Sequence, residues 1–338
     1  MKHANISVFI PHQGCPNTCS FCNQRTISRT VHAPSAQEVD ALLSQAMGHI
    51  GSQQERSNTE IAFFGGSFTA IPREYMLSLL DTAYRYVEKD HISGFHGIRI
   101  STRPDCIDEE ILMLLKKCGV TAIELGAQSM CDSVLEANMR GHTSNDVRRS
   151  ARLIKEYGFE LGLQMMCGLY KSSPENDIFT MKEIIACSPD TVRIYPVAVL
   201  EGTHLAELYK SGEYILYPFD TCVAVCAEML RRFTEAGIRV IRLGLHAEES
   251  VENGAVAGYY HPAFGEVVRS EWVKQLILQR LSSEGHAVCE APKRLMSILT
   301  GHKKSNRLYF ADKNVTFTEN TALSPDTILI NGKLFIIQ

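Results

Sequence analysis

Short apolar runs alternate along the chain with longer segments in which apolar residues recur at helical spacing. The runs occupy residues 6–10, 61–64, 98–101, 122–125, 161–167, 192–199 and 238–245. Runs of this length are typical of strands that are buried on both faces of a parallel sheet. Between two of them, a segment that begins with proline places Met76, Leu79 and Ala83 on one helical face. The pattern predicts repeated strand–helix units joined by right-handed crossovers.

Local signals mark the ends of the predicted helices. Ser35 and Glu38 have the spacing of a capping box, and Gly237 follows a helical segment at the position of a C-terminal stop. The strands are too few for a closed eightfold barrel. We therefore predict an α/β fold over residues 1–247, a partial, TIM-like (β/α)6 barrel.

The pattern changes after about residue 247. A polar, glycine-rich stretch precedes two helix-like segments, 267–281 and 292–299, and alternating, strand-like segments follow at 308–310 and 315–317. The last apolar segments, around 328–330 and 334–337, are joined by Asn331-Gly332, which is a hairpin turn signal. We predict that residues 248–338 form a small C-terminal α+β extension.

Composition narrows the class of protein. The chain has 338 residues, of which 45% are hydrophobic and 21% charged, enough for one large core and a small second one. The formal net charge of −4 argues against a uniformly basic nucleic-acid binder but permits a local basic patch. No stretch of 18 apolar residues and no signal-peptide pattern occurs, so we expect a cytoplasmic protein.

Three cysteines follow the first predicted strand directly. Cys15, Cys19 and Cys22 have CxxxCxxC spacing. Thiolates are the ligands of iron–sulfur clusters, and three of them leave the fourth iron of a cubane open to another ligand. The alternatives are a zinc site, which usually has four ligands, and three incidental buried thiols. The place of the loop at the carboxyl end of a strand, where α/β barrels carry their chemistry, favours a [4Fe–4S] cluster.

The other eight cysteines are scattered, and the total of 11 is odd, so we do not predict disulfides. Cys222 and Cys226 are four residues apart in a predicted helix and could share one face. We interpret both as reduced packing residues.

Glycine and polar residues stand at the ends of the following strands. Gly65 and Gly66 would let the backbone approach a ligand closely, although a plain tight turn is the alternative. The carboxyl ends of parallel strands meet at one edge of a sheet, so the polar residues there are expected to gather. The candidate cofactor-binding residues are Gly65, Gly66, Ser67, Ser101, Arg103, Glu124, Gln128, Arg140 and Gln164.

Taken together, these motifs resemble the radical S-adenosylmethionine (SAM) superfamily. The series CxxxCxxC, GGSF, TRPD, ELGAQS, RGHT and GTxLxxLyxxGxY is similar to the radical domain of the Elongator catalytic subunit family, over roughly residues 5–215. It is more distantly similar to the oxygen-independent coproporphyrinogen dehydrogenases. The resemblance implies a radical SAM type of barrel, a [4Fe–4S] cluster and SAM. It also implies cleavage of SAM to methionine and a 5′-deoxyadenosyl radical, with electrons from a flavodoxin- or ferredoxin-type donor.

The resemblance also implies roles for individual residues. The GGS motif would meet the methionyl amino group, Gln128 and Arg140 the ribose or carboxylate, and Gln164 the ribose, while Glu124 would help to shape the site. Relatives usually have glutamate in place of Ser101, and a serine cannot neutralise an ammonium group.

Each of these residues also has a structural interpretation. Arg103 and Asp105 could be a surface ion pair, Gln164 a satisfied core amide, and Arg140 a solvated charge at a helix end.

No residue is assigned as the catalytic group from sequence. Four histidines, His142, His204, His246 and His261, follow predicted strands or glycine turns and could act in acid–base chemistry or orient a substrate. The alternative for each is a hydrogen-bonded structural histidine. His261 lies in a segment that resembles the relatives, so His261 and His142 are the candidates.

The predicted function is a radical SAM enzyme that modifies an RNA nucleotide, in tRNA or rRNA. A radical SAM enzyme acting on a tetrapyrrole or another small molecule is the alternative, as is a non-catalytic haem-binding chaperone. Segment 248–338 is too short for an acetyltransferase domain, so we do not expect acetyl transfer. Its basic residues fit RNA phosphates, although a solvated basic face is the other explanation. They are Lys293, Arg294, Lys303, Lys304, Arg307 and Lys313.

Overall fold

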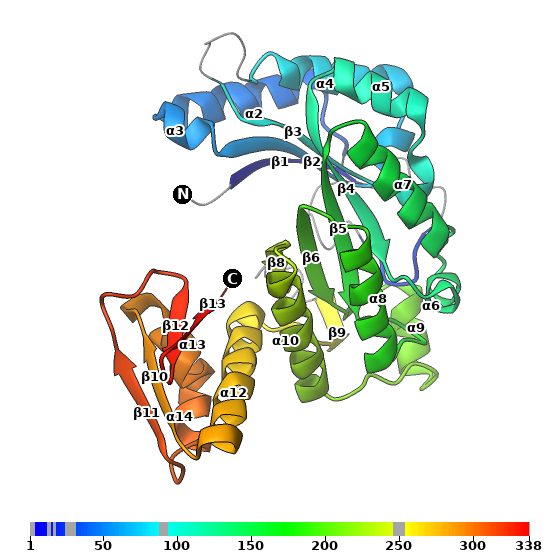
Figure 1. The fold of residues 1–338 in the computed structure, drawn as a ribbon. Coiled ribbons are helices and arrows are strands. Elements are labelled where there is room, and N and C mark those ends of the chain that lie inside the picture. The colour runs from blue at the N-terminus through cyan, green and yellow to red at the C-terminus, as the bar shows by residue number, and fades with distance from the viewer. Residues whose placement is uncertain are drawn as a thin grey trace.

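A curved sheet of seven parallel strands forms the main part of the computed structural model (Figure 1). The structure describes residues 4–11, 15, 18–23, 32–87, 94–245 and 254–337. The strand order is β1-β2-β3-β4-β5-β6-β8. The bounds are β1 (Ala4–Ile10), β2 (Thr59–Gly65), β3 (Gly97–Thr102), β4 (Val120–Gln128), β5 (Glu160–Cys167), β6 (Thr191–Pro196) and β8 (Arg239–Leu243).

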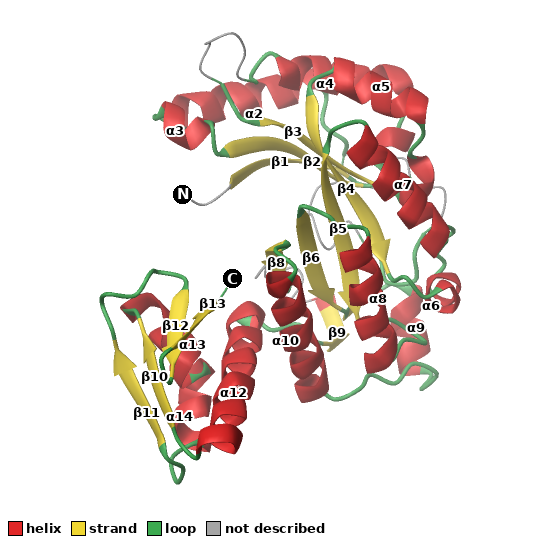
Figure 2. Cartoon of the chain, in the orientation of Figure 1, coloured by secondary structure: helices red, strands yellow, loops and turns green. Residues whose placement is uncertain are grey.

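Helices cover the outer side of this sheet (Figure 2). The helices of this part of the chain are α2 (Ala36–His49), α3 (Gln53–Arg56), α4 (Arg73–Tyr84), α5 (Glu109–Lys117), α6 (Asp132–Ala137), α7 (Ser144–Glu156), α8 (Pro174–Ala186), α9 (His204–Lys210) and α10 (Phe219–Glu235), of which α6 and α9 lie beyond the carboxyl ends of the strands. The predicted capping box at Ser35 is present, because its hydroxyl accepts from Glu38 N and the Glu38 side chain accepts from Ser35 N. The architecture confirms the partial barrel, with β8 as a seventh strand at one edge.

Alternation along the strands separates an apolar outer row from a polar inner row. Ile100, Ile123 and Val192 face the helices and are fully buried. The residues between them on the same strands face inward, and register places Ser101 beside Glu124 and Gln164 beside Arg193. The concave side of the sheet is therefore polar, as expected for the chemical face of a barrel.

A smaller α+β part follows the barrel. The antiparallel pair β7 (Ala198–Leu200) and β9 (Ala255–Gly258) precedes α12 (Phe264–Glu284), and then come α13 (Met296–Thr300) and α14 (Ser305–Tyr309). A second sheet has the order β11-β10-β12-β13. Its strands are β10 (Ala287–Ala291), β11 (Val315–Glu319), β12 (Thr327–Ile330) and β13 (Lys333–Ile336).

The sequence predicted most of this C-terminal part. The β12–β13 hairpin is confirmed, because Asn331 and Gly332 have φ angles of 47° and 77°, as a two-residue hairpin turn requires. The extended prediction for 308–310 is wrong, since Leu308 and Tyr309 lie in α14. There Asn306 is buried and donates to Ser270 O at 2.9 Å, which anchors a helical turn against α12.

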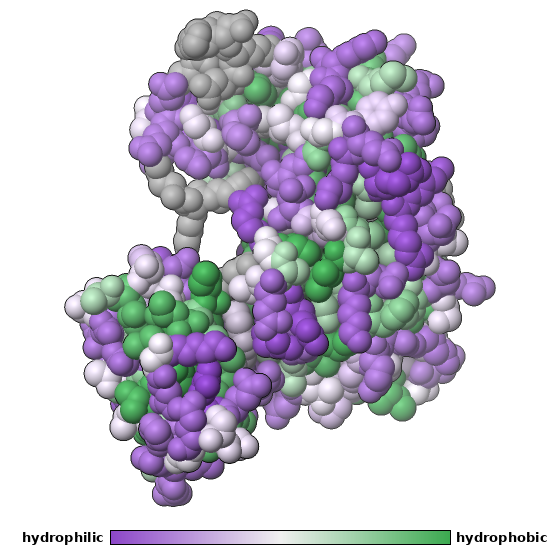
Figure 3. All heavy atoms as spheres, in the orientation of Figure 1, coloured by the Kyte–Doolittle hydropathy of each residue, from purple (hydrophilic) through white to green (hydrophobic). Residues whose placement is uncertain are grey.

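Hydrophobic side chains are visible on the surface of the C-terminal part (Figure 3). Val288, Leu334 and Ile336 of its sheet are 42%, 59% and 57% exposed. Among the described helices, none is long and apolar enough to cross a membrane. His246 and the predicted boundary between residues 247 and 248 lie outside the described residues.

Candidate functional site

The cysteine loop after β1 is fixed by two distant segments. Ser20 N donates to Asn138 O at 3.1 Å, and Ser20 Oγ donates to Asn138 Oδ1 at 2.8 Å. Ser20 O accepts from the N–H of Leu205 at the start of α9 at 2.8 Å. Both Ser20 and Asn138 are fully buried. The loop that carries Cys15, Cys19 and Cys22 is thereby held against the carboxyl edge of the sheet.

Arg140 contacts this loop directly. Its Nη1 donates to Cys19 Sγ at 3.0 Å, and its Nη2 donates to Gly126 O at the end of β4 at 2.6 Å. Met139 and Gly141 on either side have φ angles of 54° and 69°, so the backbone turns sharply to direct the guanidinium inward. Arg140 is 6% exposed, which contradicts the alternative of a solvated charge.

The Cys15 thiol lies where several motifs meet. Burial raises its pKa, and so does the charge of Cys19, whereas Arg103, Arg140 and the backbone N–H of Ser67 lower it. Residues from four separate segments therefore act on one thiol. Cys15, Cys19 and Cys22 are not close enough together to ligate a single ion in this structure. A cubane holds each thiolate on a different iron, so its ligands need not be that close.

The GGS motif joins the ends of three strands. Gly65 has a φ of 119°, and a Cβ there would lie 2.3 Å from Ile10 O. Gly66 N donates to the same oxygen at 2.9 Å. Ser67 Oγ is 2.8 Å from Thr102 Oγ1, at the end of β3. Only glycine fits the first position, because the backbones of β1 and β2 approach so closely.

Arg103 is buried and does not lie on the surface. It is 4% exposed and donates to Asp105 through Nε at 2.9 Å and Nη2 at 2.8 Å. Such a bidentate pair fixes the guanidinium plane. The alternative of a surface ion pair is therefore wrong for the arginine.

A polar group occupies the inner face of the sheet. Glu124 Oε1 accepts from Gln164 Nε2 and pairs with Arg193 Nε at 2.6 Å. The Arg193 guanidinium lies 5.2 Å from the centre of the Phe64 ring. Arg193 was missed by the sequence analysis, although a charged residue inside an apolar strand run is a usable signal. Ser20 and Asn138 were missed as well, because no local pattern marks a residue that anchors a loop.

Buried polar atoms on five of the candidate cofactor-binding residues have no hydrogen-bond partner among the described residues. Most buried polar atoms in proteins are paired, so a cluster of unpaired ones indicates a missing polar ligand. Oxygens and guanidinium nitrogens suit the amino, carboxylate and hydroxyl groups of an amino-acid nucleoside such as SAM. The atoms are Ser101 Oγ, Arg103 Nη1, Glu124 Oε2, Gln128 Oε1 and Arg140 Nε. Gln128 also has a φ of 62°, a strained value of the kind found at ligand sites.

The two candidate histidines lie in different surroundings. His142 is buried with Nε2 3.3 Å from Ala127 O, and burial, followed by the charges of Arg140 and Arg103, lowers its pKa to about 4. It is therefore neutral near neutral pH. His261 accepts from Ala263 N at 3.0 Å, and its ring centre is 5.3 Å from that of His302 in the C-terminal part.

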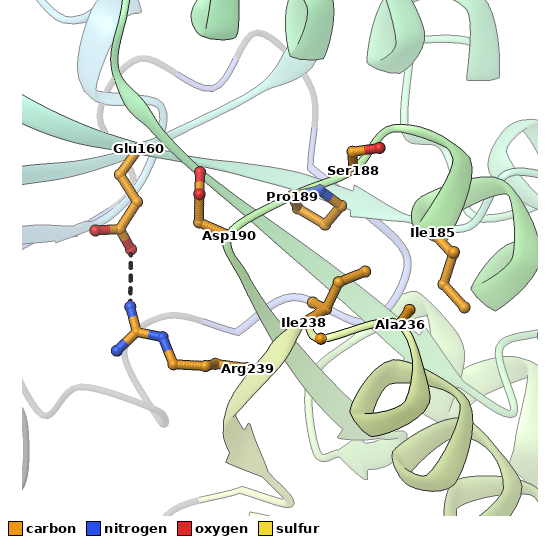
Figure 4. A pocket seen from close by; sticks show the side chains of 9 residues that line it. Glu160, Ile185, Ser188, Pro189, Asp190, Ala236, Ile238 and Arg239 are labelled. Carbon is orange, nitrogen blue, oxygen red and sulfur yellow. Dashed lines mark ion pairs between the residues drawn. The ribbon is translucent and has the colours of Figure 1, made fainter.

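A large surface pocket lies at the opposite ends of the strands (Figure 4). Its volume is about 650 Å³, and it is lined by the starts of β5, β6 and β8. Glu160 there pairs with Arg239 at 3.6 Å and with the buried Arg99 at 2.8 Å. Ion pairs at the amino-terminal ends of barrel strands serve stability, so we assign this pocket no chemistry.

Two family models and several curated proteins match this chain. Residues 9–184 match the radical SAM superfamily, and residues 189–274 match the radical SAM C-terminal domain. A tRNA uridine(34) acetyltransferase of Methanocaldococcus jannaschii is 37% identical over 183 residues, which are 49% of this chain and 34% of that protein. Elongator complex protein 3 of Homo sapiens is 34% identical over 189 residues, 51% of this chain and 34% of that protein.

The match to solved structures concerns the fold. The archaeal Methanocaldococcus infernus Elp3 with an N-terminal deletion superposes with a TM-score of 0.63 at 22% identity, covering 84% of this chain and 68% of that one. The chain spans only about a third of the length of the two curated relatives above, and 55% of a tRNA uridine(34) acetyltransferase of Dehalococcoides mccartyi, which is 25% identical over 257 residues, 66% of this chain.

Proposed function

Because this chain belongs to the radical SAM superfamily, whose enzymes use a [4Fe–4S] cluster and SAM, we propose that it modifies a nucleotide of tRNA by radical chemistry. The family match covers residues 9–184, which is more than half of the chain. The names of the curated relatives, which are tRNA-modifying or Elongator proteins, support tRNA over other substrates.

One observation carries the proposal. The cysteine loop, the GGS motif and Arg140 meet at one edge of the sheet, and buried polar atoms without a partner among the described residues surround that meeting point. In a structural core without a ligand site, such atoms would be hydrogen-bonded to other protein groups. The arrangement fits a cluster with a polar nucleoside beside it.

The residues near the cysteine loop would hold and orient the cluster. We propose that Cys15, Cys19 and Cys22 hold the cluster, whose bound form would supply the electron that cleaves SAM to a 5′-deoxyadenosyl radical. Arg140 would orient Cys19 and place positive charge beside it.

The residues around the cluster would hold SAM. The Ser101 and Gln128 oxygens, which have no partner among the described residues, would bind its polar end. Glu124, fixed by Arg193 and Gln164, would direct its free Oε2 into the same space. This carboxylate stands next to Ser101 in register and could supply the negative charge that serine lacks.

The C-terminal part would bind the RNA. Lys293, Arg294, Lys303, Lys304 and Arg307 are all exposed. Nearby, the half-exposed Tyr309 ring has Lys313 Nζ at 4.1 Å and Lys274 Nζ at 4.6 Å from its centre. Positive charge next to an exposed aromatic ring is typical of surfaces that bind phosphates and stack bases.

The decisive experiment separates radical chemistry from substrate choice. The protein is purified without oxygen, reconstituted with iron and sulfide, and given dithionite and SAM, with Cys19→Ala as the control. We expect 5′-deoxyadenosine from the native protein only, and more of it with tRNA from a strain that lacks the gene. In a second assay, a flavodoxin or ferredoxin replaces dithionite.

The outcomes are distinguishable. A missing modification in tRNA from the deletion strain, restored by the native protein, supports the tRNA substrate. 5′-Deoxyadenosine without any change in tRNA would contradict that substrate and point to a small molecule. A fully loaded cluster that never yields 5′-deoxyadenosine would contradict radical chemistry, and haem titration would then test a binding function.

A further inference from the structure

Three buried cysteines meet between the sheet and the helices that cover it. Cys167 is the last residue of β5, and Cys222 and Cys226 lie on successive turns of α10. All three are fully buried, and their Sγ atoms lie within 4.8 Å of one another. No other group of three histidine, cysteine, aspartate or glutamate side chains comes this close in the described ranges.

The spacing of the sulfurs suits one metal ion. A Zn–S bond of about 2.3 Å puts the sulfurs of a tetrahedral site about 3.8 Å apart, and a trigonal site about 4.0 Å apart. Both values lie inside the 4.8 Å limit observed here. Cysteines that serve only as small apolar residues have no reason to converge from two elements, as the isolated, fully buried Cys289 of β10 illustrates.

A hydrogen-bonded shell surrounds the thiols. The Tyr217 hydroxyl lies 3.0 Å from Cys167 Sγ and donates to Asp177 Oδ2 at 2.8 Å. Asp177 is buried and also accepts from Gly168 N at 2.8 Å and from Ser172 Oγ at 2.6 Å. Polar groups fixed in this way orient metal ligands in known sites.

We propose that Cys167, Cys222 and Cys226 form a structural site for a thiophilic divalent cation, with Zn²⁺ as the occupant. Soft thiolates select zinc over magnesium or calcium. On binding, the three thiols release their protons and three metal–sulfur bonds form, without any change in oxidation state. Three thiolates leave one position of a four-coordinate zinc, and the Tyr217 hydroxyl oxygen, 3.0 Å from Cys167 Sγ, is the candidate for it.

The site would tie β5 to α10. Cys167 follows Gln164 by three residues, so the metal would fix the strand end that presents Gln164 to Glu124. Because the thiols are shielded from solvent, the ion would enter as the chain folds. The inference does not depend on the proposed tRNA modification.

Metal content of the full chain tests the site. A Cys15→Ala/Cys19→Ala/Cys22→Ala background removes the other cysteine cluster, which could also take up zinc. We expect one equivalent of zinc by mass spectrometry in this protein, and an X-ray absorption distance to sulfur of about 2.3 Å. Adding Cys222→Ser or Cys226→Ser should abolish the zinc, whereas Cys289→Ser, the matched buried control, should retain it.

Two results would contradict the zinc site. Zinc that persists after Cys222→Ser would overturn the proposal. So would a triple-alanine background protein that is refolded in the presence of one equivalent of zinc, folds, and binds none of it. If the serine variants do not fold, the Cys15→Ala/Cys19→Ala/Cys22→Ala chain refolded with zinc or with a tight chelator decides: a higher unfolding midpoint with zinc supports the site, and equal midpoints contradict it.

Discussion

Arg140 Nη1 donates a hydrogen bond to Cys19 Sγ at 3.0 Å, across 121 positions of sequence. The same guanidinium is anchored on Gly126 O at 2.6 Å, so its position does not depend on the thiol. A fixed positive charge beside a cluster ligand stabilises the reduced, more negative form of the cluster. If Cys19 holds the proposed cluster, Arg140 is placed to raise the reduction potential of that cluster.

Replacing Arg140 by Met is therefore expected to make the cluster harder to reduce. A hydrogen bond to a charged group contributes about 1.5–3 kcal/mol, which corresponds to about 60 to 130 mV for one electron. A redox titration followed by electron paramagnetic resonance should show a midpoint potential lower by that amount. Arg140→Lys, which keeps the charge, should shift the potential less. An unchanged potential in Arg140→Met with a full cluster would mean that Arg140 is purely structural.

The buried pair of Glu124 and Arg193 predicts a large effect on stability. Arg193→Met leaves the Glu124 carboxylate without its cation, which costs about 3–5 kcal/mol at a buried site. Adding Glu124→Gln should recover part of that loss. Urea unfolding of the apo chain gives the three values and the coupling energy.

The matched control for this pair is an exposed one. Arg152 and Glu156 pair at 2.9 Å on the surface of α7, and Arg152→Met should change the free energy of unfolding by less than about 1 kcal/mol. Equal effects of Arg193→Met and Arg152→Met would contradict the view that burial makes the Glu124 pair costly to break.

Replacement of Gly65 is expected to lower both the stability of the chain and its affinity for SAM. An alanine there would combine a positive φ with a Cβ placed 2.3 Å from Ile10 O, so β1 and β2 would have to separate. We expect Gly65→Ala to lose more than about 2 kcal/mol of stability and most of the SAM affinity, measured by urea unfolding and equilibrium dialysis. Gly51→Ala, where nothing lies within 4 Å, should be neutral. A Gly65→Ala protein with native stability would contradict the close approach.

The strands and helices were predicted from the sequence more completely than the side-chain contacts between them. The seven apolar runs predicted the seven strands of the barrel because parallel strands are buried on both faces. β10 was missed, since Ala287–Ala291 alternates weakly and contains Glu290. The segment 308–310 was interpreted as an alternating, strand-like segment, whereas Leu308 lies on a helix and is 72% exposed.

Motif positions identified the edge of the sheet but not its hydrogen bonds. That Arg140 contacts Cys19, or that Glu124 pairs with Arg193, depends on how loops and strands return after many residues, which local spacing does not encode. The approach of Cys167 to Cys222 and Cys226 is of the same kind. The helix spacing brought the last two together on one face, but only the fold adds the third.

His142 predicts how the stability of the apo chain depends on pH. Its folded pKa of about 4 lies below its ordinary value of 6.5 because burial and the charges of Arg140 and Arg103 oppose protonation. Above the ordinary value, His142 is neutral in both states and has no effect. As the pH falls from that value toward the folded pKa, the unfolded chain binds a proton that the native chain does not, so stability is lost. At about pH 5 the loss should reach about 2 kcal/mol.

The measurement is a comparison with His142→Gln, which can keep a hydrogen bond to Ala127 O but does not titrate. Other buried acids, such as Asp177, whose pKa burial raises, also contribute to the pH dependence, and their effects cancel when the two proteins are compared at each pH. The free energy of unfolding of the native sequence, relative to that of His142→Gln, should therefore fall between about pH 6.5 and pH 4 and be constant above. A difference that does not change with pH would mean that His142 can be protonated in the folded chain as easily as in the unfolded one.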